Sequence, residues 1–212
     1  MIKDNLIDKG IPTKQYHASS IVRAYIISET LIWSAWNFIA PIVAIFITDI
    51  QKGTIDNAAT AYSIYLVSRV LFELYTGKYL TRKSIAYKFL MTVLGIIIIS
   101  ISYVGLAFSE LLTQTYIFYA LLGLGIGIAT PAKNSLFSSH LDKSTDAAQW
   151  GILDASVFLS MALAAVIGGF IARVYGFTTL FIIAAVANFL GIIPYLLYVK
   201  KWKKSIEETI LS

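Results

Sequence analysis

The sequence contains no cysteine and little charge. Charged residues make up 14% of the 212 residues, and the lack of cysteine excludes disulfides and thiolate metal sites. The two histidines, His17 and His140, lie too far apart in the sequence to suggest a metal site. No nucleophile is spaced with a base as a membrane enzyme would require. We therefore expect neither an enzyme nor a bound cofactor or metal.

Long apolar runs fill most of the chain. Hydrophobic residues make up 58% of the sequence. A helix rises about 1.5 Å per residue, so roughly 20 apolar residues are needed to cross a hydrocarbon core of about 30 Å. The sequence predicts an all-α integral membrane protein with six transmembrane helices. The predicted spans are residues 21–48, 57–80, 86–108, 112–137, 149–173 and 177–198.

Basic residues gather on one side of the predicted membrane. Of the 17 Lys and Arg residues, only Lys52 and Arg173 lie on the other side, and Arg69 lies within a span. Basic residues accumulate on the cytoplasmic face, so both ends are predicted to be cytoplasmic, in a plasma or inner cell membrane. The net charge of +5 follows from this asymmetry and from anionic lipid headgroups, so no nucleic acid partner is expected. The prediction comprises a cytoplasmic tail (1–20), a transmembrane domain (21–198) and a basic cytoplasmic tail (199–212).

Two parts of the sequence echo each other. Gly77-Lys-Tyr-Leu-Thr-Arg82 ends the second span, and Gly168-Gly-Phe-Ile-Ala-Arg173 ends the fifth, 91 residues later. Pro41 and Pro131 are 90 residues apart. A repeat of three helices has to cross the membrane in the opposite direction the second time, and such inverted repeats with interrupted helices are typical of transporters. We predict inverted repeats over about 21–109 and 110–198, with a chance coincidence as the alternative.

Three segments carry a family resemblance. They are Glu73-Leu-Tyr-Thr-Gly77-Lys-Tyr-Leu-Thr-Arg82-Lys83-Ser84, the Gly-rich run 121–131 and the segment 168–181. Over roughly residues 18–200 the chain resembles the amino-terminal six-helix half of the major facilitator superfamily, whose signature between helices two and three it matches at Glu73, Gly77 and Arg82. The resemblance implies half of a major-facilitator-type fold and names no substrate. Thr81 stands where the family has a gate aspartate, and Tyr119 stands where it has an arginine often linked to proton coupling.

Charged residues inside the predicted spans are the candidates for a functional site. A charge at the bilayer centre costs about 2.5–3.5 kcal/mol, so each one is a functional hypothesis. Counted from the helix ends, Glu29, Arg69 and Glu73 lie at depths at which they could meet in one cavity, whereas Lys133 and Asp154 lie shallower and are predicted to pair. The predicted substrate or coupling-ion site is formed by Glu29, Trp33, Trp36, Asn37, Tyr65, Arg69 and Glu73, and the predicted cytoplasmic gate by Gly77, Thr81, Arg82, Lys133 and Asp154.

Each of these assignments has a structural alternative. The charged pairs could be salt bridges that fix helix register and touch no solute. The tryptophans could equally face lipid or the protein core.

The main functional prediction is a transporter of small-molecule solutes that works by alternating access. The two halves of such a transporter are parallel repeats, and two copies with cytoplasmic ends can adopt that relation. The predicted unit is therefore a twelve-helix homodimer in the lipid bilayer. The alternative is a subunit that transports nothing by itself, paired with another six-helix half or acting as a membrane interaction module. A channel is a weaker alternative, because no selectivity-filter motif occurs.

Overall fold

The computed structural model describes residues 20–198, so the predicted tails lie almost wholly outside the described residues. Within this range every regular element is helical, which confirms the predicted all-α class. A helical stretch over residues 192–198 follows the last of these elements. The elements are α1 (Ser20–Ile39), α2 (Val43–Ile45), the π-helical turn η1 (Phe46–Ile50), α3 (Ile55–Leu80), α4 (Ile85–Ala107), α5 (Leu112–Ser138) and α6 (Asp146–Leu190).

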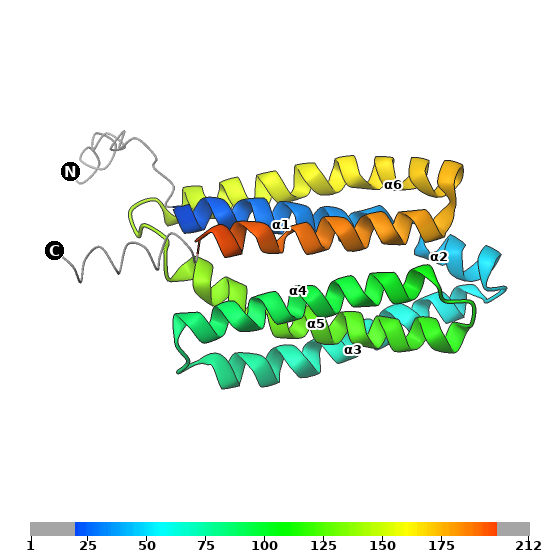
Figure 1. Cartoon of the computed structure of the whole chain (residues 1–212), viewed down its shortest axis with the longest axis horizontal. Helices are drawn as coiled ribbons and strands as arrows, with labels where there is room; N and C mark the ends of the chain where they lie inside the picture. The colour runs from blue at the N-terminus through cyan, green and yellow to red at the C-terminus, as the bar shows by residue number, and fades with distance from the viewer. Residues whose placement is uncertain (1–19, 199–212) are drawn as a thin grey trace, which may run out of the picture.

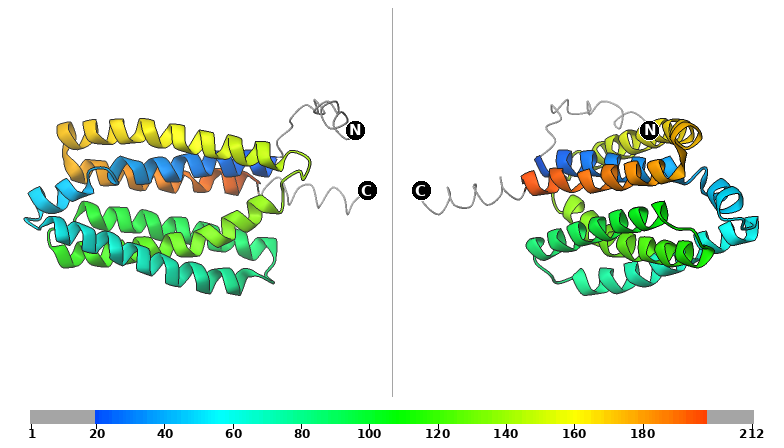
Figure 2. Two further views of the ribbon diagram at one scale, coloured as in Figure 1. Left: turned by 180° about the vertical axis from the view of Figure 1, so that it is seen from behind. Right: turned by 45° about the vertical axis from the view of Figure 1, so that its right-hand side comes forward.

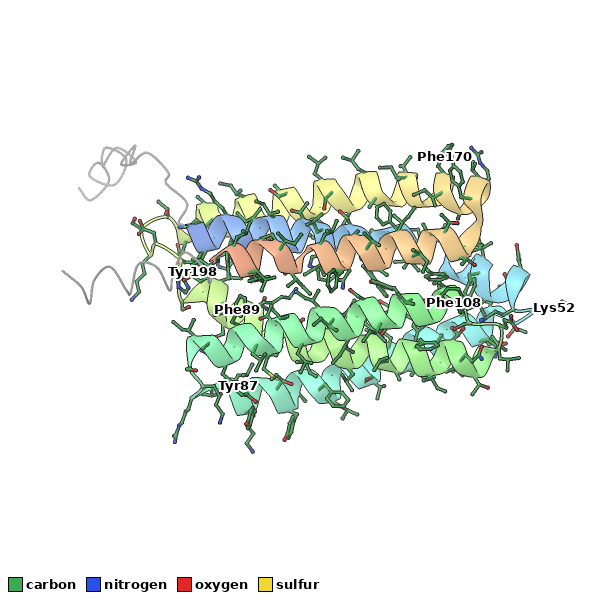
Figure 3. The ribbon with its side chains drawn as sticks, in the orientation of Figure 1. Lys52, Tyr87, Phe89, Phe108, Phe170 and Tyr198 are labelled. Carbon is green, nitrogen blue, oxygen red and sulfur yellow. The ribbon has the colours of Figure 1, made fainter. Side chains whose placement is uncertain are left out.

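The long helices lie side by side in two layers (Figure 1). One layer holds α1 and α6, and the other holds α3, α4 and α5, as the two further views also show (Figure 2). Helix α1 packs mainly against α6, and α5 packs against both α3 and α4. Helix α4 also contacts α6 and so connects the layers. Lys52, Phe108 and Phe170 lie at one end of the bundle and Tyr198 lies toward the other (Figure 3).

Helix α6 turns back on itself at Gly176. This residue has φ 82° and ψ 168°, a backbone conformation that is essentially restricted to glycine. The two parts of α6, residues 146–175 and 177–190, run in opposite directions (Figure 1). The sequence predicts a connection between residues 173 and 177, and the turn lies there.

The first predicted span is bent instead of straight. Helix α1 ends at Ile39, and the axis changes direction by 43° before the helical segment that starts at Val43. Pro41 lies in the break, where it supplies no N–H donor and its ring clashes with the preceding turn. Pro131, in contrast, lies inside the continuous helix α5. The expectation that both prolines interrupt a helix is therefore wrong for Pro131.

The described helices account for only part of the predicted span count. Three are long and apolar enough to cross a membrane, namely α4, α5 and the stretch Asp146–Tyr198, or up to four if the bent first pair counts as one span. Helix α3 is not among them, and it carries four charged residues in 26 positions. Membrane-spanning helices are thus present, and the count of six stays a prediction.

Glycines and one buried amide hold the helices together. A Cβ atom on Gly123 of α5 would collide with the carbonyl oxygen of Tyr65 in α3, and one on Gly168 of α6 would collide with that of Phe38 in α1. Small residues of this kind let membrane helices approach closely. Buried Asn188 donates its Nδ2 protons to the Ile96 carbonyl at 2.9 Å and to Ser100 Oγ at 2.8 Å. These bonds join the second part of α6 to α4.

Candidate functional site

A buried ion pair joins α1 to α5. Nζ of Lys133 lies 2.7 Å from both Oε1 and Oε2 of Glu29. The two residues are only 5% and 4% exposed. Trp33, one turn after Glu29, donates its Nε1–H to Glu29 Oε2 at 3.0 Å. The Glu29 carboxylate is therefore charge-paired and hydrogen-bonded, as a buried carboxylate has to be.

This ion pair lies on the wall of a cavity of about 290 Å³. Helices α1, α3, α5 and α6 all contribute to its lining. The charged groups are Glu29, Arg69, Lys133 and Asp154, and the rings are Tyr25, Trp33, Trp150 and Phe158. The cavity is open to the outside of the bundle, because Asp154 and Phe158 at its edge are exposed. Aromatic walls with a few convergent charges are typical of sites for small organic molecules.

A second ion pair lies along α3. Nε of Arg69 donates to Glu73 Oε2 at 3.1 Å, and Arg69 Nη1 donates to the Tyr65 hydroxyl at 3.1 Å. The side chains of Arg69 and Glu73 are 26% and 36% exposed, so this pair is far less buried than the first. The Tyr65 ring stacks on Trp36 of α1, with ring centroids 5.1 Å apart. Arg69 is thereby held at the cavity by contacts within α3, while Tyr65 contacts α1.

The structure corrects the predicted partners of two charged residues. Glu29 pairs with Lys133 and not with Arg69 or Glu73, although Glu29 and Arg69 do line the same cavity. Lys133 consequently does not pair with Asp154. Depth counts placed Lys133 about 7 Å and Glu29 about 10–12 Å from the helix ends. The long, flexible side chain of a lysine spans such a difference.

The remaining predicted residues lie in different places. Thr81 and Arg82 are exposed at the end of α3, and Thr81 Oγ1 donates to the Gly77 carbonyl at 3.0 Å. Neither they nor Gly77 belong to the described cavity lining. Asn37 donates its amide to the Trp33 carbonyl at 3.0 Å. Trp36 lines a second, much smaller cavity of about 20 Å³, together with Trp33 and Lys133.

Several cavity residues were not predicted from the sequence. The hydroxyl of Tyr25 donates to Asn134 Oδ1 at 2.7 Å, and Trp150 and Phe158 flank Asp154 in α6. Helical spacing could have identified three of these residues, namely Tyr25, Trp150 and Phe158, but not Asn134. Tyr25 precedes Glu29 by four residues, and the two rings lie four residues before and after Asp154, so each shares a helix face with a candidate charge. Within residues 20–198, no group of three or more His, Asp or Glu side chains is placed to hold a metal.

Comparisons with known proteins identify the family and the fold of the chain. The chain matches the family model described as "Major Facilitator Superfamily" over residues 25–209. It is similar to a solved structure described as "In meso crystal structure of the POT family transporter PepTSo", with a TM-score of 0.74 and 17% sequence identity. That likeness covers 85% of this chain and 37% of the transporter, and at this identity it shows the fold alone. No curated protein matches the chain. Because the family model covers most of its length, the chain is a multi-pass membrane protein that belongs to the Major Facilitator Superfamily.

Proposed function

We propose that the chain forms half of a membrane transporter that moves small solutes by alternating access, with the Glu29–Lys133 pair at its solute or coupling-ion site. One observation carries the proposal: a buried ion pair lies on the wall of an open, ring-lined cavity. Ionisable residues inside membrane segments are costly, and they mark solute and ion pathways. Family membership and the likeness to a transporter fold support the same function.

The ion pair can respond to a solute because its members come from different helices. Glu29 belongs to α1 and Lys133 to α5. A charged group that competes for either member, or a proton on Glu29, would weaken the link between the two helices. Alternating access requires such a change in helix packing around a fixed site. Arg69, Glu73 and Tyr65 complete the proposed site, and Gly77, Thr81 and Arg82 remain the proposed cytoplasmic gate. Lys133 and Asp154, which the sequence assigned to that gate, line the cavity instead.

We further infer that the helices form two inverted three-helix repeats. In the repeat, Gly77 corresponds to Gly168, and Pro131 corresponds to Pro41. A Cβ on Gly77 would lie 3.9 Å from Pro131, and Gly168 packs on Phe38, three residues before Pro41. The contact of α3 with α5 thus has a counterpart in that of α1 with α6. The matching contacts support the repeat independently of the sequence echo.

The exposed face of α3 supports assembly with a second six-helix body, which we propose to be a second copy of the chain. Val67, Leu71, Leu74 and Tyr75 are each at least 60% exposed, and a groove of about 670 Å³ runs along the same helix. The groove is also lined by Asp56, Thr60, Ser63 and Ser68, and a protein partner satisfies such polar groups better than lipid does.

A subunit that transports nothing by itself is the second candidate. Thr81 favours it, because this residue has no charge with which to lock a gate and its hydroxyl bonds within its own helix.

The test is uptake into vesicles that contain the purified full chain. A panel of labelled amino acids, sugars, organic anions and organic cations is offered, and we expect saturable uptake of at least one class. Glu29→Gln should abolish this uptake, and so should the double variant Glu29→Gln with Lys133→Met, which leaves no buried charge unpaired and should still elute as the same oligomer. Glu110→Gln, which changes an exposed carboxylate away from the cavity, is the matched control. Unchanged uptake by Glu29→Gln would rule out the Glu29–Lys133 pair as the solute or coupling-ion site. An absence of uptake for every class would favour a subunit that transports nothing by itself.

A further inference from the structure

One of the four charges at the cavity has no partner in the described chain. Lys133 is satisfied by Glu29 at 2.7 Å, and Arg69 is satisfied by Glu73 at 3.1 Å. Asp154 lines the same cavity and is exposed. Within residues 20–198, no basic side chain forms an ion pair with it. Both cations of the cavity are neutralised, so Asp154 leaves a net negative charge facing the open space.

The position of Asp154 in the helix makes this charge unusual. It lies eight residues after the first residue of α6 and five residues after the start of the predicted fifth span, about 7 Å from that end of the span. A bare carboxylate at that depth is unfavourable unless it faces water or binds a cation. The open cavity gives Asp154 a face that solvent can reach, and the lysine and arginine of the cavity are already paired with other carboxylates.

Two apolar rings flank the carboxylate. Trp150 and Phe158 lie one turn before and one turn after Asp154, and both line the cavity. The Trp150 ring packs edge-on against Phe137 of α5, with centroids 4.7 Å apart, which restricts its orientation. Phe158 is 64% exposed. Aromatic faces attract cations and apolar groups alike, so this wall suits a positive charge that carries carbon substituents.

We propose that Asp154 binds the positive group of a small organic cation, with Trp150 and Phe158 as the walls of its site. This inference rests on the proposed transport function and names its substrate class. A metal ion fits the site poorly, because among the described residues no three acidic or histidine groups lie close enough together to hold one. An organic anion would be repelled by Asp154, because the lysine and arginine of the cavity are already paired.

The test compares solutes that differ in one charge. Choline and 3,3-dimethylbutan-1-ol have nearly the same shape, but the alcohol carries a neutral carbon in place of the ammonium nitrogen. Benzyltrimethylammonium adds a ring. Binding to the purified full chain is measured by quenching of tryptophan fluorescence and by thermal stabilisation. We expect the two cations to bind and the alcohol to bind at least about tenfold more weakly.

Variants of Asp154 then assign the preference to one side chain. Asp154→Asn should weaken binding of both cations about tenfold and leave that of the alcohol unchanged, and Asp154→Glu should restore the preference. Asp146→Asn changes a carboxylate two turns earlier in α6 and should have no effect on binding. Equal binding of choline and the alcohol would overturn the proposal. So would an Asp154→Asn variant that weakens all three solutes alike, which would place Asp154 at a gate.

Vesicle uptake separates this inference from the proposed function. Cation-selective binding without any uptake would support the cation site and contradict the transport function. Uptake that depends on neither solute charge nor Asp154 would support the transport function and contradict the cation site.

Discussion

At the scale of single residues, the Glu29 carboxylate is held by partners on two sides. It accepts hydrogen bonds from Lys133 and from Trp33, and almost none of its surface is exposed. Such a pair adds little net stability, because both charges lose their water, but removing one member leaves a buried charge without compensation. Neither residue can therefore be replaced by an uncharged one without leaving the charge of the other buried and unpaired.

Replacing one member alone should destabilise the protein more than replacing both. Lys133→Met leaves the Glu29 charge buried and should lower the free energy of unfolding by about 3–5 kcal/mol. The double variant Lys133→Met with Glu29→Gln should recover most of that loss, because no buried charge remains. Thermal unfolding in detergent measures both. A double variant as unstable as the single one would contradict this account.

The sequence predicted the charges of the site better than their pairing. Glu29, Arg69 and Asp154 were recognised because a charge in an apolar run is costly, and all three line one cavity. Their partners depend on how deep each side chain reaches and on helix rotation, and a count of residues from a helix end gives neither. Lys133 reached Glu29 through its long side chain, which left Asp154 unpaired.

At the scale of helices, Gly176 determines how α6 reverses. A residue with a Cβ is strained at φ 82° and ψ 168°, whatever space surrounds it. The position of this turn was predictable because the apolar runs separate there. The bend after Ile39 was indicated by Pro41, because a proline inside a helical run kinks or ends the helix.

Two glycines of α6 should respond differently to alanine. Gly176→Ala should cost about 1–3 kcal/mol, since the turn requires a left-handed backbone. Gly169→Ala should be neutral or stabilising by up to about 1 kcal/mol, because a Cβ there meets open space and alanine favours the helix. Unfolding of the two variants in mixed micelles measures the difference. Equal stability would mean that the turn tolerates a side chain.

At the scale of the whole molecule, α3 differs from α4, α5 and α6 because it alone among these four is not apolar enough to count as a candidate membrane span. It packs against α5 on one side and, like α6, exposes apolar side chains on another. Its four charged residues explain why composition alone leaves it outside the candidate spans, although it lies alongside α4 and α5 (Figure 1). Contacts with other helices stabilise a helix of this kind, so its hydropathy alone does not indicate whether it lies in the membrane.

The proposed second copy can be tested with introduced cysteines, because the chain contains none of its own. Leu74→Cys, at a position 71% exposed on α3, should form a disulfide-linked dimer when membranes are oxidised. Ile101→Cys, at a position 53% exposed on α4, is the control and should stay monomeric. A gel without reductant reports both. Equal cross-linking of the two variants would indicate random collision. The absence of a dimer with Leu74→Cys would contradict the proposal that a second copy packs on the exposed face of α3.

The bonds of Asn188 also decide where the bundle can move. Because its amide ties the second part of α6 to Ile96 and Ser100 of α4, these two helices cannot slide past each other without leaving a buried amide unpaired. In the proposed alternating-access motion we therefore expect α4 and the second part of α6 to move together. We expect the contact between α1 and α5, held at Glu29 and Lys133, to be where the bundle changes shape.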